Sequence, residues 1–144
     1  MNAIPLWRRL LGRFLALAWL WFLATVVGVA FRGTVNPPNT AFMQEKQLEL
    51  MAHGVHGRYI KYQWTDYAEI APYMRLAVVT AEDQNFPYHH GFDWSAMDAA
   101  LHHNAKGRRV HGASTISQQT AKNLWLWPGK SYLRKLVEAW FTAL

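Results

Sequence analysis

An uninterrupted apolar stretch near the N-terminus is the strongest pattern in the chain. From Phe14 to Phe31 there are 18 consecutive residues without a charged side chain. As an α-helix this stretch would be about 27 Å long, close to the hydrocarbon thickness of a bilayer. We therefore predict a single transmembrane helix over residues 10–32, preceded by a short N-terminal segment, residues 1–9.

The basic residues that flank this helix predict its orientation. Arg8, Arg9 and Arg13 lie on the N-terminal side, and only Arg32 borders the other end. Lys and Arg are enriched on the cytoplasmic side of membrane-spanning helices, so we expect the N-terminus in the cytoplasm and residues 33–144 outside it. A cleaved signal peptide is the alternative, but its apolar core would normally be shorter.

A segment of mixed pattern follows. Residues 33–40 contain Gly, Asn and a Pro-Pro pair and read as a linker. Residues 41–52 are predicted to form a helix, and the alternation over residues 58–64 allows a short strand. We assign residues 33–65 as a linker and membrane-proximal segment, without a function.

Helical patterns continue to the end of the chain. We predict four helices, over residues 72–82, 94–105, 115–124 and 132–144. Pro72 suits a first helical position, while Asp93 or Ser95, Ser114 and Ser131 are the expected N-caps of the other three. The soluble part is therefore predicted to be all-α, and the apolar run in the first of these helices predicts that it is buried.

Composition and charge narrow the possible functions. The chain has no cysteine, which excludes disulfides and cysteine-based zinc sites. Its net charge of +6 is uneven, because residues 94–144 carry seven basic and two acidic side chains while residues 33–93 carry four basic and seven acidic ones. The basic C-terminal third indicates an anionic partner, such as a lipid head group, a phosphate or a nucleic acid, or else a solvated face.

Candidate chemistry gathers at helix ends. Glu82 and Asp83 end one predicted helix, an unfavourable place for anions that suits an acid or a base. Ser114 and Thr115 begin another, where hydroxyls and backbone N–H groups make an anion site. On the last helix Arg134, Lys135 and Glu138 share one face. Taken singly, Glu82 with Asp83 also reads as a solvated pair and the groups on the last helix as an ordinary ion-pair cluster. Gln118, Gln119 and Asn123 within the third of these helices also read as plain polar surface.

Two further interpretations are weaker. The neighbouring pairs His89-His90 and His102-His103 invite a metal site, but adjacent histidines on a helix point apart and no HExxH spacing occurs. An RNA-binding loop would rest on Lys106, Arg108 and Arg109 alone and conflicts with a location outside the cytoplasm. We expect neither a histidine metal site nor a nucleic-acid partner.

Taken together, the order and spacing of these residues resemble the first three motifs of the bacterial peptidoglycan glycosyltransferases, in their monofunctional, membrane-anchored form. The matching patterns are Glu82-Asp83-x-x-Phe86-x-x-His89-x-Gly91-x-Asp93, then Gly112-x-Ser114-Thr115-Ile116-Ser117-Gln118-Gln119-x-x-Lys122-Asn123-Leu124, and then Arg134-Lys135-x-x-Glu138. The resemblance covers residues 66–144, which would be the N-terminal part of the glycosyltransferase domain, and does not explain residues 33–65.

The resemblance implies a lysozyme-like helical domain that works at the outer or periplasmic side of the bacterial cytoplasmic (inner) membrane. Members of the family polymerise lipid II into glycan strands by inverting glycosyl transfer, forming β-1,4 links and releasing undecaprenyl pyrophosphate. The implied partners are lipid II, the undecaprenyl-pyrophosphate-linked glycan and the membrane, with other cell wall synthesis or division proteins as further candidates.

The resemblance also implies roles for individual residues. The catalytic pair would be Glu82 and Glu138. Glu82 would be the base that deprotonates the attacking sugar hydroxyl. Glu138 would assist the donor phosphates, directly or through a divalent cation (Mg²⁺ or Mn²⁺), or orient the basic residues. The residues expected to bind substrate or brace the site are Asp83, His89, Ser114, Thr115, Gln118, Gln119, Lys122, Asn123, Arg134 and Lys135. Among these, the cations would neutralise charge on the departing pyrophosphate.

The chain departs from the family at its end. It stops at Leu144, shortly after the third motif, whereas family members usually continue through two further motifs. We therefore expect an incomplete domain. Two alternatives stay open: a catalytically inactive, membrane-anchored protein that binds lipid II or peptidoglycan, and a lysozyme-like lytic enzyme.

Overall fold

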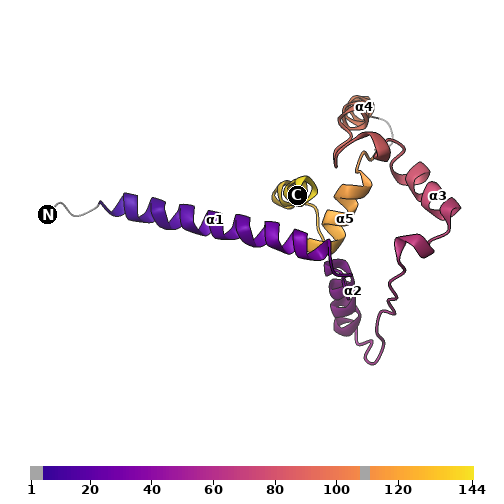
Figure 1. The fold of residues 1–144 in the computed structure, drawn as a ribbon, viewed down its shortest axis with the longest axis horizontal. Helices are drawn as coiled ribbons and strands as arrows, with labels where there is room; N and C mark the ends of the chain where they lie inside the picture. Colours follow the sequence, from indigo (N-terminus) through magenta and orange to yellow (C-terminus); the bar gives the residue numbers. More distant parts are fainter. Residues whose placement is uncertain (1–4, 108–110) are drawn as a thin grey trace. The chain divides into compact units, whose positions relative to one another are not determined.

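The computed structural model describes residues 5–107 and 111–144. Within these ranges every regular element is helical, which confirms the all-α prediction (Figure 1). The elements are α1 (Leu6–Arg32), α2 (Ala41–Ala52), the 3₁₀ turn η1 (Tyr67–Glu69), α3 (Pro72–Glu82), the 3₁₀ turn η2 (Phe86–Tyr88), α4 (Trp94–Ala105), α5 (Ile116–Trp125) and α6 (Tyr132–Ala143). Arg108 and Arg109, two of the three residues on which the RNA-binding interpretation rested, lie outside the described residues.

The chain divides into two compact units, Met1–Pro37 with Leu144, and Pro38–Ala143. Helix α1 belongs to the first unit and is 27 residues long with no buried residue. Among the described residues it is the one helix long and apolar enough to cross a membrane, as expected from its uncharged run. It begins at Leu6, directly after Pro5, and therefore includes the last residues of the segment predicted to precede it.

The second unit opens with α2, which has the predicted bounds. Its N-cap is Thr40, whose Oγ1 accepts a hydrogen bond from the Met43 N–H at 3.2 Å. The strand predicted over residues 58–64 is wrong, because that segment is irregular. The described residues offer it no partner strand, and the Gln47 side chain takes that place by bonding the Arg58 carbonyl at 2.8 Å and the Ile60 N–H at 3.0 Å.

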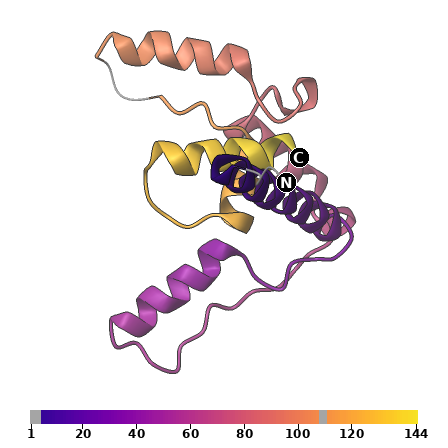
Figure 2. The ribbon, with the colours of Figure 1, turned by 90° about the vertical axis from the view of Figure 1, so that its left-hand side faces the viewer.

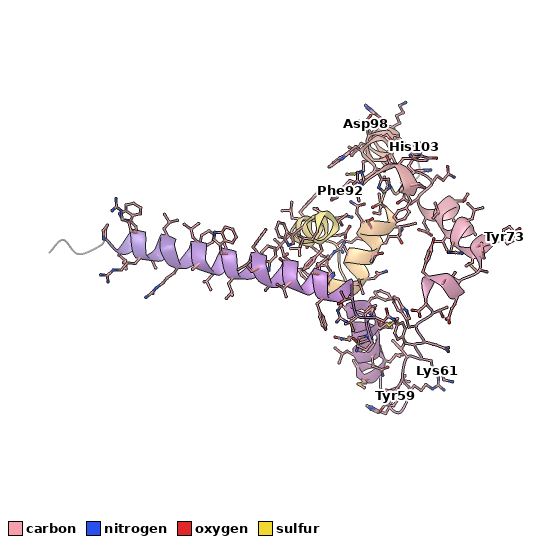
Figure 3. All side chains as sticks on the ribbon, viewed as in Figure 1. Tyr59, Lys61, Tyr73, Phe92, Asp98 and His103 are labelled. Atoms are coloured by element: carbon pink, nitrogen blue, oxygen red, sulfur yellow. The ribbon has the colours of Figure 1, made fainter. Side chains whose placement is uncertain are left out.

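Helices α3 and α4 also have the predicted bounds, with Pro72 starting α3 and Asp93 capping α4. The predicted burial of α3 is wrong. No residue of α3 is buried, and Leu76 is 63% exposed. Tyr73 points away from the rest of the unit (Figure 3) and is 86% exposed. Hydrogen bonds to Glu82 and to the C-cap Asp83 tie the end of α3 to α5, while its apolar side chains stay uncovered.

Helices α5 and α6 pack side by side (Figures 1 and 2). The rings of Trp125 and Phe141 stack with centroids 5.1 Å apart. Within the described residues of this second unit the buried apolar side chains are only Ala100, Ala121 and Leu126, while the buried polar ones are Asp83, Asp93, Thr115, Gln118, Arg134 and Glu138. All six buried polar residues belong to the three motifs, so the centre of this unit is a polar network.

Candidate active site

Asp83 joins segments of the chain that are far apart in sequence. It is the C-cap of α3, and its side chain is only 3% exposed. Its carboxylate accepts a hydrogen bond from the Ile116 N–H at 2.9 Å, and His89 Nε2 lies 2.9 Å from its Oδ1. A carboxylate is well placed at the start of α5, where the helix dipole is positive. The anion site predicted at this helix start is thus partly filled by the protein's own carboxylate.

The N-cap of α5 is Thr115 rather than Ser114, so that prediction is wrong. Thr115 Oγ1 accepts the Gln118 N–H at 3.2 Å, and Gln118 Oε1 accepts the Thr115 N–H at 3.0 Å. This reciprocal pair is a capping box, which requires Glu or Gln three residues after the cap. Ser114 cannot form one, because Ser117 stands at that position.

The turn between α3 and α4 is fixed against two helices. Thr115 Oγ1 donates to the Gly91 carbonyl oxygen at 2.6 Å. Gly91 has φ +86°, and a Cβ there would lie 3.1 Å from both Cγ2 and the carbonyl oxygen of Thr142 on α6. Glycine is required at this position by conformation and by space, which explains its place in the motif.

Asp93 anchors the other end of this turn. Its carboxylate accepts hydrogen bonds from the Ser95 hydroxyl at 2.6 Å, the Ala96 N–H at 2.8 Å and the Asn85 amide at 2.7 Å. These three donors, in that order of importance, lower the pKa of Asp93 from its ordinary value of 3.8 to about 2.

The lowered pKa of Asp93 predicts a pH-dependent contribution to stability. A depressed pKa stabilises the folded state above the ordinary value of 3.8, and that contribution is lost as the pH falls toward about 2. We expect Asp93→Ala to lower the thermal midpoint at neutral pH, with the difference from wild type shrinking below pH 4. Circular dichroism melts across this range test it, with the exposed Asp98→Ala as control. A difference that stays constant with pH would contradict the assignment.

Glu82 is the exposed carboxylate of the site. It ends α3, and its Oε2 accepts a hydrogen bond from the Gln119 amide at 2.8 Å. It lines a cavity of about 200 Å³ together with Asp83, Asp93 and Ser114. Because Asp83 and Asp93 are buried and already accept several hydrogen bonds, Glu82 is the carboxylate of this cavity that a ligand can reach. The geometry favours Glu82 as the base and Asp83 as a brace.

Glu138 lies at the centre of an ion cluster on α6. It is 2% exposed, its Oε2 accepts a hydrogen bond from Arg134 at 3.1 Å, and its Oε1 accepts one from Lys135. Arg134 is 8% exposed, whereas the side chain of Lys135 is 51% exposed. The cluster therefore combines a buried ion pair with one cation that faces solvent.

Neither candidate metal position fits an ion. Both oxygens of Glu138 bond cations of their own helix, which disfavours a third cation beside them. Asp83, His89 and Asp93 offer ligand atoms within 4.8 Å of one another, a cluster that sequence reasoning did not find. Both carboxylates already accept hydrogen bonds from backbone N–H groups or side chains, and His89 Nε2 bonds Asp83, whereas His89 Nδ1 is buried without a partner. Because the carboxylates are occupied in this way, we read this cluster as a brace.

Three cations meet in a second cavity. It encloses about 340 Å³, and its lining includes Lys122, Lys130 and Arg134 but no carboxylate. Asn123 lines the same cavity, and Lys130 and Arg134 also line an adjoining space with Lys135. Sequence reasoning missed Lys130, because it lies in the loop between α5 and α6, where no helical spacing relates it to Lys122 or Arg134. A cavity with several cations and no carboxylate suits a phosphate-bearing ligand.

Helix α5 connects the carboxylate cavity to the cation cavity. Its N-terminal residue Ile116 bonds Asp83, Gln119 bonds Glu82, and Lys122 lines the cation cavity. Gln119 and Lys122 are three residues apart and so share a face of the helix. One rigid element thus positions an exposed carboxylate and a cation-lined cavity about one helical turn apart, an arrangement that would suit deprotonating one group while binding a phosphate.

Known proteins match most of the chain. The family model described as Transglycosylase matches residues 49–144, which begins upstream of the first motif. A biosynthetic peptidoglycan transglycosylase of Xanthomonas oryzae pv. oryzae (strain KACC10331 / KXO85) is 47% identical over 142 residues, covering 99% of this chain and 58% of that protein. Proteins of the same name from Xylella fastidiosa (strain 9a5c) and Pasteurella multocida (strain Pm70) are each 46% identical, over 96% and 91% of this chain and 55% and 52% of their own. The chain therefore spans little more than half the length of these relatives.

Proposed function

The chain belongs to the transglycosylase family, and from this membership we propose that it takes part in peptidoglycan synthesis by polymerising lipid II into β-1,4-linked glycan. Its fold class is that family's lysozyme-like helical class. The observation that carries the proposal is that Gln119, which bonds Glu82 of α3, and Lys122 share one face of α5, where Glu82 lines a carboxylate cavity and Lys122 lines a cation cavity.

The proposed step uses these groups in order. Glu82 accepts the proton of the acceptor's 4-hydroxyl as that oxygen attacks the anomeric carbon of the donor. The bond from this carbon to the pyrophosphate oxygen breaks, with inversion at the carbon. Lys122, Lys130 and Arg134 stabilise the charge that develops on the departing pyrophosphate. No step is assigned to a metal ion, because the residues around Glu138 do not fit one.

Other side chains hold this arrangement in place. Gln119 fixes the carboxylate of Glu82, and Asp83 with His89 ties the end of α3 to the start of α5. Ser114 borders the carboxylate cavity and Asn123 the cation cavity, where each can contact sugar or phosphate. Glu138 orients Arg134 and Lys135, while Thr115 and Gln118 cap the helix that carries the site.

We also propose the cellular setting. Helix α1 could span a membrane, and its basic N-terminal flank favours an orientation with residues 33–144 outside the cytoplasm. The partners would be lipid II, the undecaprenyl-pyrophosphate-linked glycan in the bacterial inner membrane and other cell wall synthesis or division proteins.

The test is a glycan assay with the chain reconstituted in lipid vesicles that contain labelled lipid II. We expect label to move into polymer that gel electrophoresis resolves by length. Binding of lipid II without polymer would assign the chain to the inactive binding class, and shortening of preformed glycan would assign it to the lytic class. Either outcome overturns the proposal.

A further inference from the structure

The membrane-proximal segment builds a groove that the proposed reaction leaves without a role. One wall is a face of α2 that carries Met43, Gln44, Gln47, Leu48 and Met51. These positions recur at the four-residue spacing of one helix face. The remaining wall comes from the segments that precede and follow α2 in the sequence, and its residues are Pro38, Asn39, Tyr59, Ile60 and Tyr62. Figure 3 shows Tyr59 beside the end of α2.

The groove is suited to an uncharged, apolar ligand. It encloses about 500 Å³, within the usual size of ligand pockets, and none of its lining residues is charged. The charged residues of α2, which include the ion pair of Lys46 and Glu49 at 2.8 Å, lie outside its lining. Charge is therefore segregated around the helix, and the uncharged face is turned toward the irregular segment.

The amide groups in the groove are already hydrogen-bonded. Gln44 Nε2 donates to Asn39 Oδ1 at 2.9 Å. Gln47 donates to the Arg58 carbonyl and accepts from the Ile60 N–H. Each of these amides thus makes at least one hydrogen bond within the protein, and the rest of the lining is mainly methionine, leucine, isoleucine and tyrosine carbon. A hydrocarbon chain gains free energy on such carbon, and the bonds already made lower the cost of covering the amides.

The groove adjoins the cation cavity through the first turn of α2. Phe42 lines the cation cavity with Lys122 and Arg134, and the next residue, Met43, lines the groove. The amino end of α2 also meets α5 (Figure 1). An amphiphile with a phosphate head and a long hydrocarbon tail matches the two neighbouring sites, head with cations and tail with uncharged carbon.

We propose that this groove binds the polyprenyl chain of the pyrophosphate-linked donor. Residues 38–62 would then recognise the lipid part of that donor. The assignment rests on the proposed function for the identity of the head group. The proposal for the groove concerns only the hydrocarbon chain of the donor. Binding experiments with prenyl pyrophosphates therefore test it without any polymerisation.

The test compares prenyl pyrophosphates of increasing chain length, from geranyl through farnesyl to undecaprenyl, bound to the whole chain in detergent. We expect the affinity to rise at least about tenfold along this series. Met51→Glu should remove most of that rise and leave geranyl pyrophosphate binding unchanged. Ala52→Glu, the same change one residue further and outside the groove, should retain it. Lys122→Ala should weaken all three ligands by a similar factor.

A second measurement uses the wild-type chain, without any substitution in the groove. A prenyl pyrophosphate with a photoreactive diazirine on its chain should crosslink to residues 38–62, and mass spectrometry locates the adduct. Crosslinking elsewhere, or preferential labelling of the groove by an equally tagged phosphatidylcholine, would overturn the assignment, as would an equal length dependence in Met51→Glu and wild type. If the chain fails to polymerise lipid II but shows the expected length dependence and crosslinking, the proposed function is wrong and the proposal for the groove still holds.

Discussion

Replacing Glu82 by glutamine is expected to lower the rate of lipid II polymerisation by at least about a hundredfold, because the site then lacks its base. The substitution is nearly isosteric. The new amide oxygen can still accept the hydrogen bond that Gln119 donates to Glu82 at 2.8 Å, so the end of α3 should keep its position. The measurement is the initial rate of polymer formation from labelled lipid II in vesicles, together with lipid II binding.

The expected pattern separates catalysis from binding. Lipid II affinity should change little in Glu82→Gln, since the cations of the second cavity are untouched. Glu69→Gln is the matched control, because Glu69 lies in η1 and lines neither cavity. Polymerisation at a near-normal rate in Glu82→Gln would remove the base role from this residue. No other carboxylate of the cavity is both exposed and positioned by α5.

Replacing Glu138 by alanine is expected to destabilise the helical unit by about 3–5 kcal/mol. Glu138 is 2% exposed and bonds Arg134, which is itself 8% exposed. Removing the carboxylate leaves a guanidinium that is desolvated without a counter-charge. Its Nε already lacks a hydrogen-bond partner, so few local bonds compensate. Urea unfolding of the protein in detergent, followed by tryptophan fluorescence, gives the free energy of unfolding.

A paired substitution distinguishes structure from function at Glu138. Because desolvation offsets most of the attraction in a buried ion pair, Arg134→Met with Glu138→Leu should recover much of the lost stability. Lys135→Met, which removes the half-exposed partner, should cost at most about 1 kcal/mol. If the double variant is stable but does not polymerise lipid II, the ion pair acts on the donor phosphates and is not needed for stability. The buried-pair argument would be contradicted if Glu138→Ala lowered the free energy of unfolding by no more than Lys135→Met does.

The helices could largely be predicted because their signals are local. Pro72 starts α3, Asp93 caps α4 and Ser131 bonds the first turn of α6, each through contacts within three or four residues. The local signal failed at Ser114, where the neighbouring Thr115 completes a capping box with Gln118. It failed over residues 58–64 as well, because alternation indicates a strand only where another strand can pair with it.

Most residues of the site could be predicted from the sequence, but their arrangement in space could not. Motif spacing brought out Glu82, Gln119, Lys122 and Glu138, yet it could not say that Gln119 would bond Glu82. It also gave no role to Lys130, which enters the site only because the loop after α5 folds beside Lys122. Such relations depend on contacts between residues that are far apart in the sequence.

By itself the sequence determined the apolar helix, the all-α class and the order of the three motifs, because helical periodicity, caps and uncharged runs act over a few residues. Only the tertiary structure decided which side chains are buried. On α6 it buries Arg134 and Glu138 and leaves Leu133 and Leu136 66% and 70% exposed, the reverse of the usual preference. It also joined Asp83 to Ile116 across 33 positions. Burial and long-range hydrogen bonds are set by how elements pack, and no local pattern in the chain encodes that packing.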